Sequence, residues 1–345
     1  MKIAVVKPDH LGDFILAIPA IRALLAKNHV VTLFIASGNV ALARSYFPEL
    51  EIVSLDLPYL VRKLDQKAWS PAYRKLGALR GFDLVFFLRR DDFFDHANIH
   101  NWTTSGFLIE DRHDIHQTQL EKAIVARVTG DFSIDRMFFQ GAPEPFPRAL
   151  RSVAFVIGAG FPFKKWSPLA WAELGQMLLQ REAGVQLLVG PGEIAEGKLI
   201  ARAIGLDDAR DVYVGSQDFR ALKQWLQTHD LVVAADGGGA HLCSDVKPIV
   251  SVFGPSPPRR FSPTGAYNRV VTRGLSCSPC MGLHARGVNA CMSRECLYGL
   301  SPTHVLAAMH LRSQPPGASE SIDAQRGVTV EFGLSAAPPE IKKKQ

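Results

Sequence analysis

A run of glycines directly after an apolar segment constrains the fold of this 345-residue chain more than any other feature. Residues 231–235 have the composition of a buried strand, and Asp236 and three glycines separate them from the helix-like segment 240–245. Strand, glycine turn and helix start, in that order, expose backbone N–H groups at a helix N-terminus, where a phosphate binds well. Glycines also let the backbone approach an anion closely. The simpler interpretation is a tight turn in which Asp236 caps the helix and His241 lies on the surface.

The same alternation of strand-like and helix-like segments runs through most of the chain. Apolar runs separated by segments of helical spacing are typical of a parallel sheet covered on both faces. Ligands bind such sheets at the carboxyl ends of the strands, so functional residues are expected in the loops that follow strands. The expected strands are 2–6, 30–36, 51–55, 82–88, 152–157, 185–189, 231–235 and 248–253, and the expected helices are 14–26, 40–47, 169–180, 195–204 and 219–228.

The pattern divides the chain into two α/β halves with a proline-rich segment, residues 140–147, between them. We therefore expect one domain over residues 1–148 and a second over residues 149–312. Residues 313–345 are rich in Pro, Gly, Ser and Ala, which predicts a disordered tail, with a short strand at 328–332 as the alternative.

Composition narrows the location and the partners. No apolar run approaches the length of a membrane span, and the apolar start is too short for a secretion signal, so a cytoplasmic location is expected. The net charge of +6 favours anionic partners such as nucleotides, phosphosugars or acidic lipid head groups, unless it marks only a generally basic surface. Nucleic acid is disfavoured, because no Lys/Arg cluster with interleaved aromatic residues is present.

Three loops after expected strands carry residues suited to group transfer. Asp13 would lie at a helix N-terminus, where the helix dipole keeps a carboxylate ionised and able to accept a proton, unless it is only an N-cap. Lys164 can neutralise a departing diphosphate. Glu193 can accept hydrogen bonds from ribose hydroxyls or cap the following helix. Trp166 is expected to pack against the core. The third glycine of a dinucleotide-binding fingerprint is missing, which disfavours a dehydrogenase.

Four cysteines near the end of the second half have the spacing C-x2-C-x10-C-x4-C. Four thiols that include one tight pair can bind zinc tetrahedrally, but the spacing fits no standard finger. Partly buried free thiols are the alternative that we favour. The residues are Cys277, Cys280, Cys291 and Cys296.

Taken together, these segments resemble glycosyltransferase family 9, the ADP-heptose:lipopolysaccharide heptosyltransferases. The matches occur in the family's order over roughly residues 1–310, and the cysteine cluster also recurs in many members. They are Gly12-Asp13 followed by residues 18–24, Gly158-Ala159 with Lys164 and Trp166, residues 190–193, Asp236-x-Gly238-x-x-His241, Lys247-Pro248, and residues 253–255.

The resemblance implies an α/β fold of GT-B architecture, with two Rossmann-like, doubly wound parallel-sheet domains facing a central cleft. It implies inverting transfer without an obligatory catalytic metal, with Asp13 as base and Lys164 stabilising the departing diphosphate. It also implies ADP-heptose as donor and an anionic glycolipid of the lipopolysaccharide core as acceptor, with peripheral association at the inner membrane. The implied donor-binding residues are Gly158, Ala159, Glu193, Asp236, Gly237, Gly238, Gly239 and His241; the acceptor-side candidates are Lys7, Gly12, Arg89 and Arg90.

Two departures from the family pattern bear on the donor. The family usually has Thr after the Asp of its signature, where this chain has Gly237, and Thr or Ser often stands where Ala159 and Gly160 stand. Both changes remove hydroxyls that could contact phosphates. Two other functions therefore stay open at this point: a nucleotide-sugar epimerase, which needs no acceptor, and a catalytically degenerate protein that binds a nucleotide sugar without turnover.

Overall fold

The computed structural model describes two compact units, Met1–Asp135 and Arg136–Ala336. The expected linker falls partly on residues 132–144, which lie outside the described residues, so the boundary at residue 148 stays a prediction. No helix in the described part of the chain is long and apolar enough to cross a membrane. The described residues are 1–57, 70–89, 106–108, 115–131, 145–216, 218–265, 267–280, 291, 293–311 and 318–332.

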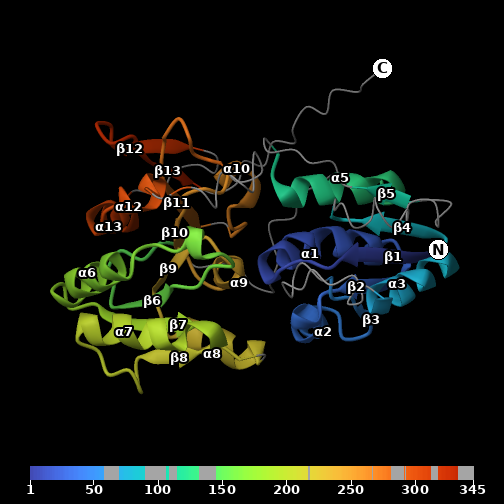
Figure 1. The fold of residues 1–345 in the computed structure, drawn as a ribbon, viewed down its shortest axis with the longest axis horizontal. Helices are drawn as coiled ribbons and strands as arrows, with labels where there is room; N and C mark the ends of the chain where they lie inside the picture. Colours follow the sequence, from blue (N-terminus) through green and yellow to red (C-terminus); the bar gives the residue numbers. More distant parts are fainter. Residues whose placement is uncertain are drawn as a thin grey trace. The chain divides into compact units, whose positions relative to one another are not determined.

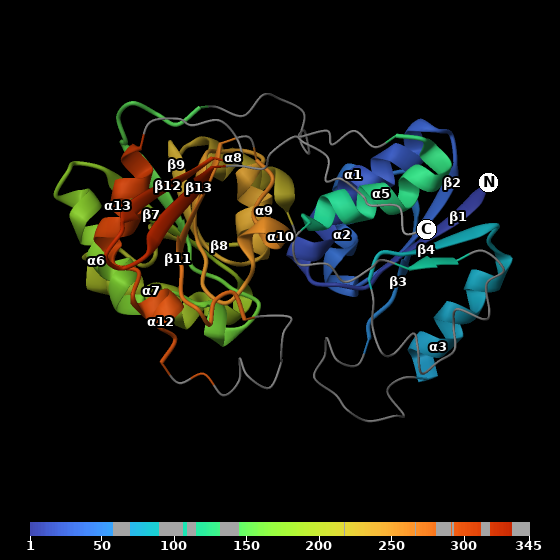
Figure 2. The ribbon, with the colours of Figure 1, turned by 90° about the horizontal axis from the view of Figure 1, so that it is seen from above.

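The first unit is built on a five-stranded parallel sheet with the order β3-β2-β1-β4-β5. Helices α1 and α5 lie side by side (Figures 1 and 2). The inner strands β1, β2 and β4 are mainly apolar and buried because both faces of a parallel sheet are covered, whereas the edge strand β3 is only partly buried. The elements are β1 (Lys2–Lys7), α1 (Leu11–Ala26), β2 (Val30–Ile35), α2 (Val40–Tyr46), β3 (Glu51–Ser54), α3 (Ser70–Leu76), β4 (Leu84–Phe87), β5 (Gly106–Leu108) and α5 (Gln117–Thr129).

The second unit contains an eight-stranded sheet with the order β12-β13-β11-β10-β9-β6-β7-β8 (Figure 1). The six strands from β8 to β11 are parallel to one another. The elements are β6 (Ser152–Val156), α6 (Pro168–Leu179), β7 (Gly184–Val189), α7 (Ile194–Ile204), β8 (Val212–Val214), α8 (Phe219–Gln227), β9 (Leu231–Ala235), α9 (Gly238–Ser244), β10 (Ile249–Val252), α10 (Pro258–Phe261), β11 (Asn268–Arg273), α12 (Glu295–Tyr298), α13 (Pro302–His310), β12 (Ser319–Asp323) and β13 (Val328–Phe332).

Both units have the strand order of a Rossmann-like doubly wound sheet. In each, the first strand of the unit lies between the second and the fourth, so the chain reverses its direction of winding beside that strand. The reversal falls between β1 and β4 in the first unit and between β6 and β9 in the second. Ligands of open α/β sheets bind at such switch points, outside the carboxyl ends of the strands. The loops after these four strands are therefore the places to look for a site.

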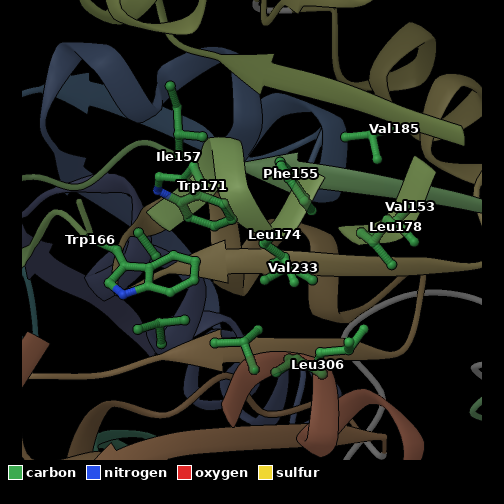
Figure 3. Packing of buried hydrophobic residues seen from close by; sticks show 14 of the residues in the cluster. Val153, Phe155, Ile157, Trp166, Trp171, Leu174, Leu178, Val185, Val233 and Leu306 are labelled. Atoms are coloured by element: carbon green, nitrogen blue, oxygen red, sulfur yellow. The ribbon is translucent and has the colours of Figure 1, made fainter. Parts of the chain in front are cut away.

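Two tryptophans anchor the core of the second unit (Figure 3). Trp166 packs edge-on against Trp171 with ring centroids 5.0 Å apart, and Phe155 lies 5.0 Å from Trp171 on the other side. The Trp166 indole donates a hydrogen bond to the Leu300 carbonyl at 2.9 Å, which satisfies its one polar group inside the core. The prediction that Trp166 packs against the core is confirmed. This packing fixes the end of the loop that follows β6.

The expectation of a disordered tail after residue 312 is wrong for residues 318–332. A hairpin of β12 and β13 continues the sheet beyond β11, with both new pairings antiparallel. Val328 and Val330 are buried, and His304 of α13 contacts Asp323 at 3.0 Å. The alternating valines fit a strand with one buried face, but the surrounding Pro, Gly, Ser and Ala residues dominated the composition. The strand that was expected as the alternative at 328–332 is confirmed.

Candidate functional site

In the second unit, an ion pair links the loops that follow β6 and β9, on the two sides of the switch point. The Lys164 ammonium lies 3.1 Å from Asp236 Oδ2 and 3.3 Å from Oδ1. Asp236 is almost fully buried, whereas the Lys164 side chain keeps 14% of its surface exposed. A cation that is partly open to solvent and held at a switch point is suited to bind an anionic ligand group. The sequence placed both residues in such loops, and the structure brings them together.

Glycines lie where the loops after β6, β7 and β9 approach one another closely, and at Gly237 the neighbouring atoms are backbone. A Cβ on Gly237 would lie 2.5 Å from the Gly158 carbonyl oxygen, and a Cβ on Gly158 would lie 2.4 Å from Glu193 Oε2. A Cβ on Gly239 would lie 2.7 Å from Val156 Cγ1. The loops after β6, β7 and β9 therefore form one contiguous layer. The glycine at position 237 has a steric reason, because the usual Thr side chain would collide with the neighbouring loop.

Helix α9 begins within the glycine run, so its N-terminal N–H groups lie at the turn after β9, as the phosphate interpretation requires. Gly237 is the N-cap of α9, in extended conformation, and Gly238 is the first helical residue. The simpler interpretation is wrong on two points, because Asp236 is not the cap and His241 is 6% exposed rather than at the surface. Asp236 is instead committed to Lys164, the contact that joins the two loops.

Glu193 has a local structural contact besides its expected ligand role. Its Oε2 accepts a hydrogen bond from the Gly190 N–H at 3.0 Å, which closes the turn after β7. Glu193 is the N-cap residue of α7, but its side chain makes no capping hydrogen bond to that helix. Its Oε1 lies 3.7 Å from the Lys165 ammonium, which also pairs with Glu196. Lys165 and Glu196 were not identified from the sequence. The carboxylate is thus held from two sides against the backbone of Gly158, with about a fifth of its side chain exposed.

In the first unit, Asp13 is the third residue of α1, which begins at Leu11 rather than at residue 14. The N-cap is His10, so the alternative that Asp13 caps this helix is wrong. Asp13 is half-buried, and Gly12 beside it is buried. A carboxylate in the first turn interacts favourably with the helix dipole. The position suits a carboxylate that must stay ionised beside a ligand.

Beneath this turn lies a buried ionic network that the sequence did not reveal. The Lys7 ammonium donates to Glu121 Oε1 at 2.6 Å and to the Leu88 carbonyl at 2.8 Å, and lies 3.2 Å from Asp9 Oδ2. Asp9 also pairs with Arg89, two residues after the end of β4. Lys7, Asp9 and Glu121 are nearly inaccessible to solvent. The network therefore joins the two loops of this switch point, as Lys164 and Asp236 do in the second unit. Arg90 lies outside the described residues.

Burial and the neighbouring charges shift the pKa values of the groups in this network in opposite directions. Burial alone would lower the pKa of Lys7, but the carboxylates of Asp9, Glu121 and Asp13 raise it well above its ordinary value. Burial raises the pKa of Glu121 to about 7, although Lys7 and Gln117 oppose that shift. Burial would also raise the pKa of Asp9, but Lys7 and Arg89 hold it below its ordinary range. Lys7 is consequently a permanent cation, and Glu121 is the group that titrates near neutrality.

The four clustered cysteines are free thiols in the structure. Burial, and after it the neighbouring Cys280, Cys291 and Cys277, raise the pKa of Cys296 to about 11, so the four cysteines lie near one another. A backbone hydrogen bond from Arg294 is the main cause that lowers the pKa of Cys291. Among the residues that the structure describes, no three His, Cys, Asp or Glu side chains are arranged to hold a metal ion.

Two Rossmann-like sheets, each with charged loops at its switch point, give the chain the two-domain α/β fold that GT-B proteins share. The sequence profile of glycosyltransferase family 9 (heptosyltransferase) matches residues 107–287, more than half of the chain. The chain belongs to this family, and the membership supports glycosyltransferase activity.

Solved structures agree with the family at the level of the fold. The chain superimposes on ADP-heptose lipopolysaccharide heptosyltransferase II of E. coli with a TM-score of 0.62 and 17% identity, over 90% of this chain and 98% of that one. A family 9 glycosyltransferase of Veillonella parvula gives a TM-score of 0.66 at 16% identity, over 89% and 95%. E. coli heptosyltransferase WaaC, with ADP-2-deoxy-2-fluoro heptose, gives 0.57 at 17%, over 78% and 92%. None of the curated proteins compared with the chain matches it.

Proposed function

We propose that this protein transfers a heptose from ADP-heptose to a lipopolysaccharide core or related anionic glycan, with inversion at the anomeric carbon. The observation that carries the proposal is the pairing of Lys164 with Asp236 at the switch point of the second unit, inside a layer of loops that glycines hold together. WaaC, which has a similar fold, was solved with an analogue of ADP-heptose. The family membership supports the transfer, and the donor-side geometry supports a diphosphate ligand.

The donor half supplies charge stabilisation. As the bond between the anomeric carbon and the diphosphate oxygen breaks, negative charge develops on the departing diphosphate. Lys164 is partly exposed and is positioned by Asp236, so its ammonium can absorb that charge without first reorganising. The backbone of Gly237, Gly238 and Gly239, with Gly158 and Ala159, would lie against the phosphates, with His241 behind it. Glu193 would bind the ribose through its Oε1 edge.

The acceptor half supplies the base. Asp13 accepts the proton of the acceptor hydroxyl while that oxygen forms its bond to the anomeric carbon from the face opposite the diphosphate. One displacement without an enzyme nucleophile inverts the configuration. Electrons of the broken bond go to the ADP oxygen beside Lys164, so the mechanism needs no obligatory metal. We further propose that residues up to 148 form an acceptor domain, and that the rest of the second unit, including the hairpin of β12 and β13, forms a donor domain. The protein would act at the cytoplasmic membrane face, where Arg89 and Arg90 would face acceptor phosphates.

The test is transfer from a panel of nucleotide sugars to deacylated lipopolysaccharide, with products identified by mass spectrometry. We expect a mass increase of one heptose with ADP-heptose and inverted linkage by NMR. Asp13→Asn should lower kcat by about 10²–10⁴-fold, the usual contribution of a positioned base, and leave ADP affinity unchanged. Near-normal turnover by that variant would refute the assignment of the base. Conversion of the donor alone would indicate an epimerase, and ADP-heptose binding without any product would indicate a degenerate binding protein.

A further inference from the structure

Two consecutive lysines in the loop after β6 take partners on opposite sides of that strand. In the sheet, β6 lies between β9 and β7. Lys164 pairs with Asp236 in the loop after β9. Lys165 pairs instead with Glu193, in the turn after β7, and with Glu196 in the first turn of α7. The proposed mechanism uses Lys164 on the departing diphosphate and leaves Lys165, on the ribose side of the loop, without a role.

The backbone fixes where the Lys165 side chain starts. Lys165 follows the short 3-10 turn Pro162–Lys164 in extended conformation and directly precedes Trp166. The Trp166 ring is almost fully buried, and its indole N–H donates to the Leu300 carbonyl at 2.9 Å. Successive side chains of an extended segment point to opposite sides. Burial of Trp166 therefore directs Lys165 away from the core, where its side chain is 24% exposed.

The Glu193 carboxylate is oriented by backbone on one side and by Lys165 on the other. Its Oε2 accepts from the Gly190 N–H at 3.0 Å, and a Cβ on Gly158 would lie 2.4 Å from Oε2 and 2.8 Å from Oε1. The Lys165 ammonium lies 3.7 Å from Oε1. That distance makes an ion pair but is too long for a hydrogen bond, so Lys165 attracts Oε1 without occupying its lone pairs. Oε1 can therefore accept from a ribose hydroxyl while the ammonium holds it in place.

The exposure of this cluster suits ligand binding better than a structural role. The Glu193 side chain is 19% exposed and that of Glu196 is 28% exposed, so both carboxylates lie at the protein surface. Ion pairs in such positions contribute little to the free energy of unfolding. Glu196 also accepts a hydrogen bond from the Lys165 ammonium. The cation is thus anchored on α7 by one carboxylate while it attracts the other.

We propose that Lys165 is a positioning residue that acts through Glu193: its ammonium, anchored by Glu196, holds Oε1 in the orientation that accepts the ribose hydroxyls of the donor. The inference rests on the proposed function, in which Glu193 binds the ribose of ADP-heptose. It gives the two lysines different tasks, because Lys164 acts on the charge of the diphosphate and Lys165 acts on a neutral sugar through a carboxylate. A side chain that is fixed before the ligand arrives loses less conformational entropy on binding.

The experiment measures by calorimetry the binding of ADP and of its 2′,3′-dideoxy analogue, which lacks the ribose hydroxyls. Lys165→Met should weaken ADP binding by about 3–10-fold, the size expected when one hydrogen bond is lost, and should change the affinity for the analogue by less than about twofold. Lys165→Arg keeps the cation and should restore most of the ADP affinity. Lys198→Met is the control, because this lysine of α7 lies 4.0 Å from Asp208, and it should change neither affinity.

Two further measurements separate positioning from a general disturbance of the loop. Lys165→Met combined with Glu193→Gln should bind ADP no more weakly than Glu193→Gln alone, because the amide leaves no charge for Lys165 to attract. In the transfer assay, Lys165→Met should raise KM for the donor and leave kcat unchanged, since the ribose contact is the same in the ground state and the transition state.

The outcomes distinguish the role of Lys165 from that of Glu193. Equal losses for ADP and the analogue in Lys165→Met would mean that Lys165 contacts the phosphates or supports the loop, and unchanged ADP affinity would mean that it serves only Glu196. Either result overturns the inference. If Glu193→Gln weakens both nucleotides equally, the ribose assignment fails and the role of Lys165 fails with it. If Glu193→Gln weakens ADP alone and Lys165→Met does not, only the role of Lys165 is refuted.

Discussion

At the switch point of the second unit the loops are joined mainly by close approach of their backbones, whereas at that of the first unit they are joined by charged side chains. In the second unit, Gly158 and Gly237 lie where three loops touch, Gly239 lets α9 approach β6, and the ion pair Lys164–Asp236 joins the loops after β6 and β9. In the first unit, Lys7, Asp9, Arg89 and Glu121 join the corresponding loops, and burial isolates most of that charge from solvent. The same sheet topology thus supports two different electrostatic environments.

The difference follows from what each side is proposed to do. A diphosphate needs a cation and bare amides that the ligand can touch, so the donor side keeps Lys164 partly open. A general base needs a fixed electrostatic environment, and on the acceptor side the cation, Lys7, is enclosed by protein oxygens. If this comparison is correct, charge removal in the second unit affects the reaction more than the fold, and charge removal in the first affects both.

Lys164→Ala gives the largest effect expected in the second unit. Loss of a positioned cation that stabilises a departing group should lower kcat/KM by about 10²–10³-fold, comparable to the loss of one oxyanion donor. The free energy of unfolding should fall as well, because the nearly buried Asp236 carboxylate loses its cation, and urea unfolding measures that loss separately from the kinetics. Steady-state kinetics with ADP-heptose measures the effect.

Lys198→Ala is the matched control for that variant. Lys198 is an exposed lysine of the same unit, 4.0 Å from Asp208, and its removal should leave kcat/KM unchanged. Equal losses in both variants would mean that general positive charge, and not the place of Lys164, drives the reaction.

Glu121→Gln tests the first unit through the pH dependence of stability. The pKa of Glu121 is raised from 4.5 to about 7, so the folded state binds this proton more tightly than the unfolded state does. The stabilising contribution of this group is therefore complete below about pH 4.5 and is lost as the pH rises to about 7. Lys7 stays charged throughout this window, because its pKa is raised. The variant lacks the titration, so its stability relative to wild type should improve by up to about 3 kcal/mol across the window.

Urea unfolding at a series of pH values measures that difference. Glu196→Gln is a suitable control, because Glu196 lies in the other unit and its side chain is 28% exposed. A difference between Glu121→Gln and wild type that is independent of pH would show that Glu121 is ionised in both states, and would contradict the burial effect on its pKa.

The loops at the switch point of the second unit were largely predictable from the sequence, because the residues that indicate them lie close together in the chain. A glycine run after an apolar strand, a lysine after a small-residue loop and a Gly-Pro-Gly-Glu turn each lie within a few residues of a strand end, and parallel topology brings strand ends together. What the sequence could not reveal was which partner each residue takes. Asp236 was expected to hold the ligand directly, and in the structure its carboxylate forms an ion pair with Lys164.

The ionic network of the first unit was less predictable, because the residues that pair in it are far apart in the chain. Lys7 and Glu121 are separated by 114 positions, and no local pattern pairs them. One signal was present: Glu121 lies on the same helical face as Ile124 and Val125, where a carboxylate interrupts an apolar stripe. A charged residue in such a stripe is rarely buried without a partner, so the position of Glu121 indicated that a cation lies beside it.

Gly237→Ala gives the smallest expected effect and tests the backbone side of the comparison most directly. Its methyl group would lie 2.5 Å from the Gly158 carbonyl and 3.1 Å from the Ala159 Cα, and both obstacles are backbone. The two loops must separate, which should lower the free energy of unfolding by about 1–3 kcal/mol, as overpacking does. Gly160→Ala is the matched control, since a Cβ there meets nothing within 4 Å, and its cost should stay within about 0.5 kcal/mol. Because loop separation also moves Asp236 away from Lys164, ADP should bind Gly237→Ala more weakly than Gly160→Ala in calorimetry. Equal stability and equal ADP affinity in the two variants would mean that the loops tolerate separation, and that the glycines do not build the donor side.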